Sequence, residues 1–187
     1  MSFTSDQILD PDAVLRLVDL ACETASGQDL ALLLENKGSP IEGESTRDFE
    51  DGKKRLDAMG YILIAGVQAA PGASAAKVST SNLIVVRRCD AASASIASLL
   101  KSQTEDLKVV LSTFKASGDN PSTDLQPTLE MEIGKGRVAH FSILTCGSLG
   151  GTPCEVVAFA HQGIEIRSAP QTKTGQRGAV RTCTFSA

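Results

Sequence analysis

The chain of 187 residues has the length of one domain with at most a short appendage, which excludes a two-domain enzyme with separate cofactor and substrate lobes. Hydrophobic residues make up 42% and charged residues 21%, a composition typical of a soluble folded protein that is neither disordered nor embedded in a membrane. The formal net charge is −4, Trp is absent and only 4% of residues are aromatic, so we expect no nucleic-acid partner and no aromatic stacking platform.

The N-terminal segment predicts a helix that precedes the main domain, and we assign residues 1–28 to this helical extension. Asp10 can cap the helix, Pro11 suits its first position, and Gly27 supplies a stop. Because an apolar stripe follows at helical spacing, we expect the helix to lie on its own chain, on a neighbour, or to act as a docking arm. The stripe consists of Val14, Leu17, Val18 and Ala21.

From residue 29 onward, short apolar runs alternate with turn residues at fairly regular intervals, a pattern that indicates antiparallel strands. In residues 128–133 the apolar side chains alternate with Glu130 and Glu132, which predicts a strand with one wet face. The tripeptide Gly134-Lys135-Gly136 that follows predicts a hairpin turn. We expect strands at residues 29–35, 56–69, 77–88, 107–114, 128–133, 138–145, 155–161 and 164–167.

One helix interrupts these strands. Asp90 can cap it, and Ile96, Leu99 and Leu100 follow at helical spacing. A single helix cannot cover so many strands, so the strands must bury their apolar faces on one another. We therefore expect a mainly β fold, an antiparallel β-barrel or sandwich of two packed sheets, with one flanking α-helix and the N-terminal helical extension.

Histidine and cysteine residues offer the main alternative, a small Cys/His enzyme or metal-binding protein. His140 and His161 each have a cysteine within seven positions, Cys146 and Cys154 respectively. However, the five cysteines form no CxxC pair, lack zinc-ligand spacing, and carry no local signature of a cysteine hydrolase. We therefore expect reduced thiols and no catalytic residue, metal or cofactor, and we keep the alternative open.

A highly charged segment lies at residues 42–57, with six acidic and four basic residues. Calcium binding would need fixed ligand spacing and a terminal glutamate, and the segment has neither. Mixed signs favour a solvated loop or an interface loop.

The order of several motifs gives the chain a family resemblance. Ile41-Glu42-Gly43-Glu44-Ser45, the charged loop, and Leu56-Asp57-Ala58-Met59-Gly60-Tyr61 resemble a Gly-Glu-Ser motif, long loop and second strand of the Hcp (haemolysin-coregulated protein) family. Asp90-Ala91-Ala92-Ser93 resembles the start of that family's only helix. Residues 107–115, 129–145 and 155–166 follow its closing strands in order, and residues 170–184 resemble its C-terminal tail. Members of this family form the tube of bacterial type VI secretion systems.

The resemblance implies that residues 29–187 form a β-barrel tube domain and that the protein is structural rather than enzymatic. Its copies would form hexameric rings that stack into a hollow tube, with secreted effector proteins, spike components and sheath or baseplate components as partners, and no membrane partner. A tail-tube protein of a phage or another contractile injection particle is the alternative within the same fold. Residues 1–12 are acidic and lack an apolar run, so we expect a protein of the bacterial cytoplasm without a cleaved signal peptide. The resemblance implies that the protein is later secreted.

The resemblance also assigns candidate residues. Ile62 and Ile64 lie on a strand that would face the lumen, and Asp90 would cap the helix. The charged segment would form an assembly loop that makes inter-subunit or inter-ring contacts. Its candidate residues are Glu42, Gly43, Glu44, Ser45, Arg47, Asp48, Glu50, Asp51 and Lys53.

Overall fold

The computed structural model describes residues 9–24, 28–46, 49, 51–68, 77–115, 126–145, 150–170 and 178–186. Two helices lie in these ranges, α1 (Pro11–Thr24) and α2 (Ser93–Lys101). Neither helix is long and apolar enough to cross a bilayer. The remaining regular structure is β-strand, as the apolar runs of the sequence predict.

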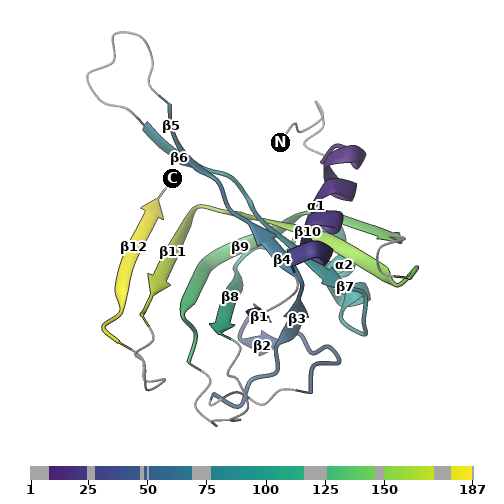
Figure 1. The fold of residues 1–187 in the computed structure, drawn as a ribbon, viewed down its shortest axis with the longest axis horizontal. Coiled ribbons are helices and arrows are strands. Elements are labelled where there is room, and N and C mark those ends of the chain that lie inside the picture. The colour runs from purple at the N-terminus through teal and green to yellow at the C-terminus, as the bar shows by residue number, and fades with distance from the viewer. Residues whose placement is uncertain are drawn as a thin grey trace.

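The strands pair antiparallel into one large sheet and one separate hairpin (Figure 1). Along the sheet the order is β2-β1-β8-β9-β10-β7-β4, while β3 pairs with β1, and β11 joins β12 to β9. The sheet contains β1 (Gln28–Asn36), β2 (Ser39–Pro40), β3 (Leu56–Ala58), β4 (Gly60–Ile62), β7 (Leu83–Arg88), β8 (Leu107–Lys115), β9 (Leu129–Thr145), β10 (Pro153–His161), β11 (Gly163–Ser168) and β12 (Arg181–Ser186). The hairpin consists of β5 (Ala65–Gln68) and β6 (Lys77–Thr80).

The main core lies on the inner face of this sheet. Buried residues of β1, β7, β8, β9, β10, β11 and α2 belong to one apolar cluster, with Leu32, Val85, Ile96 and Phe159 among its members. Strands from distant positions in the sheet order share this cluster, so the sheet bends around its own inner face. The predicted mainly β antiparallel fold with two helices is confirmed.

The prediction of two packed sheets is wrong. Ten strands are hydrogen-bonded into a single sheet, and within the described ranges the strand path does not close into a barrel. The periodicity of a sequence shows which side chains share a face, but not which strands are joined edge to edge where a sheet bends.

A second, smaller apolar cluster lies on the outer face, under α1. Val18 of the helix is fully buried there, and Ile84, Val86 and Val156 of the sheet belong to the same cluster. Residues of β7 and β10 are therefore buried on both faces. The stripe predicted for α1 is confirmed, because all four of its residues are buried. At the helix start, the Asp12 amide donates to Oδ1 of Asp10 (3.3 Å), as expected of an N-cap.

The predicted hairpin turn at Gly134-Lys135-Gly136 is wrong, because these residues lie inside the long strand β9. Gly136 pairs with Leu107 of β8 and with His161 of β10, close to register shifts in both ladders. A Cβ at Gly136 would lie 3.3 Å from the carbonyl oxygen of Leu107. Glycine here allows a close strand approach at a bulge, where it resembles a turn signal in the sequence.

Two long strands predicted at residues 56–69 and 77–88 are each interrupted. The first becomes β3, β4 and β5, and the second becomes β6 and β7. At the break, the Ile64 amide donates to Oγ of Ser81 (3.0 Å), and the Ser81 amide donates to the Ile64 carbonyl (2.8 Å). Beyond this pair of bonds the chain leaves the sheet and forms the β5–β6 hairpin, which projects from the body (Figure 1).

The C-terminal segment forms a strand that the sequence patterns did not predict. All six residues of β12 pair with β11, from Arg181 opposite Ser168 to Ser186 opposite Gly163. Five of these six are exposed, so the segment lacks the buried apolar face that usually identifies a strand.

Helix α2 begins later than predicted, at Ser93. Ala92 occupies the N-cap position, without a side-chain cap. Asp90 instead caps the preceding turn, because its Oδ1 accepts the Ala92 amide (2.9 Å) and the Asp90 amide donates to Oγ of Ser93 (3.1 Å).

Candidate assembly site

The first half of the predicted assembly loop, with Ile41 just before it, is tied to β1, to the turn before α2 and to β3. The Ile41 amide donates to the Leu34 carbonyl of β1 (2.8 Å), and the Glu44 amide donates to Oδ2 of Asp90 (3.3 Å). Oγ of Ser45 donates to Oδ1 of Asp57 (3.0 Å). The Gly-Glu-Ser motif therefore forms a fixed turn against the start of α2 rather than a free loop.

The second half of the loop folds back over the outer face of β1 and β8. The ring of Phe49 lies 5.8 Å from the ring of Phe114, centroid to centroid, and the guanidinium of Arg55 lies 4.1 Å from the Phe49 centroid. Nζ of Lys53 lies 2.5 Å from Oε1 of Glu35, whose side chain is only 4% exposed. Phe49 was not among the candidate residues, because the sequence gives it no apolar neighbour at strand or helix spacing.

Asp51 and Arg55 form a two-point ion pair, with both Nη–Oδ distances at 2.9 Å. Burial raises the pKa of Asp51, but the bonds from Arg55 and from the Lys53 amide outweigh it and hold the pKa below its ordinary value. Ion pairs therefore contribute to the conformation of the loop. A candidate residue such as Asp51, which already binds another loop residue, is less available for contact with a neighbouring subunit.

Exposure separates these candidate residues. Glu42, Glu44 and Asp51 are exposed, whereas Gly43, Ser45 and Lys53 are half-buried. The predictions for Arg47, Asp48 and Glu50 lie outside the described residues.

A buried ion network underlies the loop. Nη1 of Arg87 lies 2.7 Å from Oε1 of Glu155, and Nη2 of Arg87 lies 2.5 Å from Oδ1 of Asp90. The side chains of Arg87 and Glu155 are 1% and 0% exposed. Burial raises the pKa of Asp90, but bonds from Arg87 and from the Ala92 and Glu44 amides outweigh it, so the net shift is downward. The sequence does not reveal this network, because the adjacent residues Arg87 and Arg88 are the same residue type and differ only in the face of β7 on which they lie.

A cleft of about 600 Å³ lies beside the network. Glu44, Ser45 and Asp57 line it from the loop and β3, and Arg87 and Asp90 line it from the end of β7. The cleft therefore joins the fixed turn to the buried charges.

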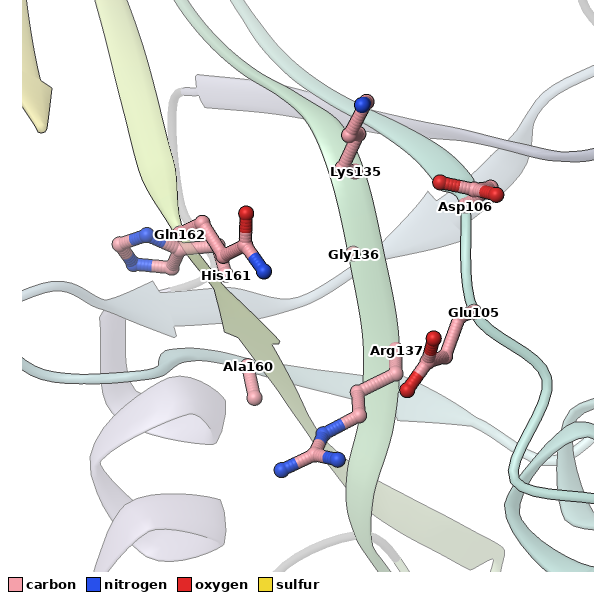
Figure 2. Close-up of a pocket in the computed structure, with 8 residues that line it drawn as sticks. All are labelled: Glu105, Asp106, Lys135, Gly136, Arg137, Ala160, His161 and Gln162. Carbon is pink, nitrogen blue, oxygen red and sulfur yellow. The ribbon is translucent and has the colours of Figure 1, made fainter. Parts of the chain in front are cut away.

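A second cleft, of about 240 Å³, lies where β9 passes the end of β10. Figure 2 shows Lys135 and Arg137 from β9 facing Glu105 and Asp106, with His161 at the end of β10. Nε2 of His161 lies 3.1 Å from the Ser81 carbonyl oxygen. Charges of both signs line this cleft, and the described residues that line it include no cysteine, serine or threonine.

The residues of the Cys/His alternative are dispersed. The Leu9 amide donates to Nδ1 of His140 (3.5 Å), whose other ring nitrogen contacts Oγ of Ser142. Cys154 is fully buried, with Sγ 4.0 Å from Sδ of Met59. Cys146 lies outside the described residues. In the part of the chain that the structure describes, no group of three His, Cys, Asp or Glu residues could hold a metal ion.

The two residues predicted to face a lumen lie in different surroundings. Ile62 packs against the cluster under α1 and is only partly exposed, whereas Ile64 is 49% exposed at the base of the hairpin. Helix α1 therefore covers the surface to which Ile62 belongs.

The wet face predicted from alternating glutamates is present on β9 and β11. Arg167 of β11 lies 2.6 Å from Glu130 and 2.5 Å from Glu165, and it also contacts Glu132. Lys108 of β8 pairs with Glu132 as well (3.0 Å). This face is a charged, partly exposed surface, in contrast to the covered faces of the neighbouring strands.

Comparisons with known proteins agree on one family. The family model described as "Type VI secretion system effector, Hcp" matches residues 33–167. Comparison with curated proteins finds no match.

Solved structures share the fold. One described as a type six secretion system protein is 21% identical, with a TM-score of 0.69, and the match covers 84% of this chain and 94% of that chain. Hcp1 from Salmonella typhimurium is 17% identical, with a TM-score of 0.61 and coverage of 84% and 95%. Secreted protein Hcp3 from Pseudomonas aeruginosa is 12% identical, with a TM-score of 0.57 and coverage of 85% and 97%.

Proposed function

We propose, from the premise that this chain belongs to the Hcp family of type VI secretion tube proteins, that its copies form hexameric rings that stack into a hollow tube. The family is one of secreted, structural, non-enzymatic proteins, and the chain is a tube subunit of this kind. Such an assembly needs surfaces through which the subunits contact one another and surfaces that bind the other components of the secretion system.

The observation that carries the proposal is the projecting hairpin. Strands β5 and β6 pair with each other and with no other described strand, and Val67 lies opposite Val78 across the ladder. Ile64, Val67 and Val78 are 49%, 64% and 45% exposed. An isolated two-stranded hairpin is marginally stable in water, and exposed apolar side chains on it favour burial against another chain. A neighbouring subunit supplies that burial in a ring.

The test is the mass of the native particle by light scattering, with negative-stain images of the same fraction. The parent chain is expected to form rings of about six subunits or stacked tubes, consistent with closed cyclic symmetry. Val67→Asp is expected to shift the protein toward monomers, because a desolvated carboxylate at a subunit contact is costly.

Ile143→Asp is the matched control, because Ile143 of β9 is 59% exposed and lies outside the hairpin. A parent chain that stays monomeric at every concentration would contradict the proposal. Equal losses of assembly in both variants would show that the hairpin has no specific role in the subunit contact.

The finer parts of the proposal follow the family. Residues 29–187 form the tube domain, and residues 1–28 are an N-terminal extension whose helix α1 packs on it. The loop residues from Glu42 to Lys53 make contacts between subunits or rings, as the exposed carboxylates of Glu42, Glu44 and Asp51 permit. Effector proteins, spike components and sheath or baseplate components are the partners, and the chain is made in the bacterial cytoplasm and then secreted.

A further inference from the structure

We propose that Asp90, oriented by the buried Arg87, is a positioning residue that holds the Gly43-Glu44-Ser45 turn against the start of α2 and fixes the conformation in which the assembly loop meets a neighbour. This inference rests on the proposed assembly, and it names the residues that set the position of the loop.

The two carboxylate oxygens of Asp90 bind different segments of the chain. Oδ1 accepts the Ala92 amide (2.9 Å) and contacts Nη2 of Arg87 (2.5 Å). Oδ2 accepts the amide of Glu44 (3.3 Å), which lies 46 positions earlier in the sequence. One side chain therefore links the turn, the start of α2 and the end of β7. We call this arrangement the Asp90 clasp.

Gly43 shows how closely the turn fits the clasp. A Cβ at this position would lie 2.4 Å from Oδ2 of Asp90 and 2.7 Å from Cδ2 of Leu56. Both distances are too short for real atoms, so with any other residue the turn, the Asp90 carboxylate or the Leu56 side chain must move, and the contact between the turn and Asp90 is disturbed. The glycine is required here for close approach rather than for an unusual backbone angle.

The ion network beneath the clasp is better explained by its effect on the orientation of Asp90 than by a contribution to the stability of the fold. Buried ion triads are often no more stable than apolar replacements of similar volume. Here the triad carries two carboxylates against one guanidinium, and Nε of Arg87 and Oε2 of Glu155 have no hydrogen-bond partner among the described residues. What the triad does supply is a fixed orientation for Asp90, whose remaining oxygen then binds the amide of Glu44.

The experiment uses the full chain and two kinds of variant. Gly43→Ala places a Cβ against the side chains of Asp90 and Leu56, and its control is Gly134→Ala, because a Cβ at Gly134 meets no atom within 4 Å. Arg87→Met combined with Glu155→Leu removes the orienting charges but leaves Gly43 and Asp90 in place. The readouts are hydrogen exchange of the Glu44 amide, ring formation against protein concentration, and the thermal unfolding midpoint.

Both the Gly43 variant and the double variant are expected to exchange the Glu44 amide about tenfold faster and to need about tenfold more protein for half-assembly, the effect of losing one charge-assisted hydrogen bond. The unfolding midpoint of the double variant is expected to stay close to that of the parent. Gly134→Ala is expected to change neither the exchange rate of the Glu44 amide nor the protein concentration for half-assembly.

The outcomes separate the inference from the proposed function. Unchanged Glu44 exchange in both variants overturns the clasp. Faster exchange with unchanged assembly overturns its positioning role and leaves the tube proposal standing. A monomeric parent chain overturns the tube proposal and the role of the clasp in assembly, whereas Glu44 exchange still reports whether the clasp forms. If the double variant unfolds, Gly43→Ala decides the question alone.

Discussion

Two segments cover the outer face of the sheet in different ways. Helix α1 covers β4, β7 and β10 with a stripe of apolar side chains. Phe49 and residues 51–55 contact β8 through the ring of Phe114 and β1 through the ion pair of Lys53 with Glu35. This segment is held together by a cation–π contact and an ion pair that Arg55 makes within it. Apolar burial depends on the area removed from water and involves no charge that salt could screen or acid could neutralise, whereas exposed ion pairs weaken as salt and acid increase. One sheet can therefore carry both kinds of cover. We call α1 the fixed cover, and we call the segment from Phe49 to Arg55 the adjustable cover, because its stability changes with salt and pH.

The largest effect is expected from a charge placed under the apolar cover. Val18→Asp should lower the free energy of unfolding by about 3 kcal/mol, because Val18 is 0% exposed and the carboxylate would be buried without a partner. Urea unfolding followed by circular dichroism measures the loss. Leu15→Asp on the same helix is the control, since Leu15 is 46% exposed and its change should stay within about 0.5 kcal/mol. Similar losses in both would mean that α1 does not depend on its stripe.

A smaller effect is expected at the adjustable cover. Phe49→Ala should cost about 1 kcal/mol, because it removes the ring contact with Phe114 and the platform under Arg55. Urea unfolding gives the free energy, and hydrogen exchange of the Lys53 amide reports on the loop itself. Arg55→Lys keeps the charge but loses the planar stacking, so it should produce roughly half of that loss. Unchanged exchange at Lys53 in the Phe49 variant would show that the ring does not anchor the loop.

The smallest effects are expected from pH, and they fall in different windows for the two covers. Burial lowers the pKa of His140, so the unfolded chain binds the proton first as pH falls below about 6.5. The folded protein therefore loses stability from that pH downward. The amide of Leu9, just ahead of α1, donates to Nδ1 of His140, and this bond needs the neutral ring. The start of α1 should loosen first.

At the loop, Asp51 has a pKa that is lower in the folded protein than in the unfolded chain. Such a carboxyl contributes stability above its unfolded pKa, near 4, and loses that contribution as pH falls through the folded pKa. Hydrogen exchange at several pH values should therefore show two steps, at α1 below about pH 6.5 and at residues 49–55 below about pH 4. His140→Gln should abolish only the first step, and a single common step would contradict the comparison.

The sequence predicted those parts of the fold that repeat along the chain. The stripe of α1 and the alternation of Glu130 and Glu132 each identify an element and its wet or dry face, and both are confirmed. The turn chemistry misled the prediction at Gly134-Lys135-Gly136, because a glycine at a bulge and a glycine at a turn are identical in sequence.

The candidate site was predicted only in outline. The Gly-Glu-Ser turn was recognised by resemblance, but its contact with Asp90 joins residues 46 positions apart and leaves no local pattern. The buried pair of Arg87 and Glu155 spans 68 positions, and a charged residue is buried only when its partner is present. Phe49 was missed because an isolated aromatic residue in a charged segment has no periodicity to reveal its contact.

The root of the hairpin gives the subunit a defined mechanical joint. Two hydrogen bonds between Ile64 and Ser81, of 3.0 Å and 2.8 Å, tie the two arms together where they leave the sheet. These two bonds restrict rotation of the arms about their exit from the sheet, so the direction in which the β5–β6 hairpin leaves the body is set at Ile64 and Ser81.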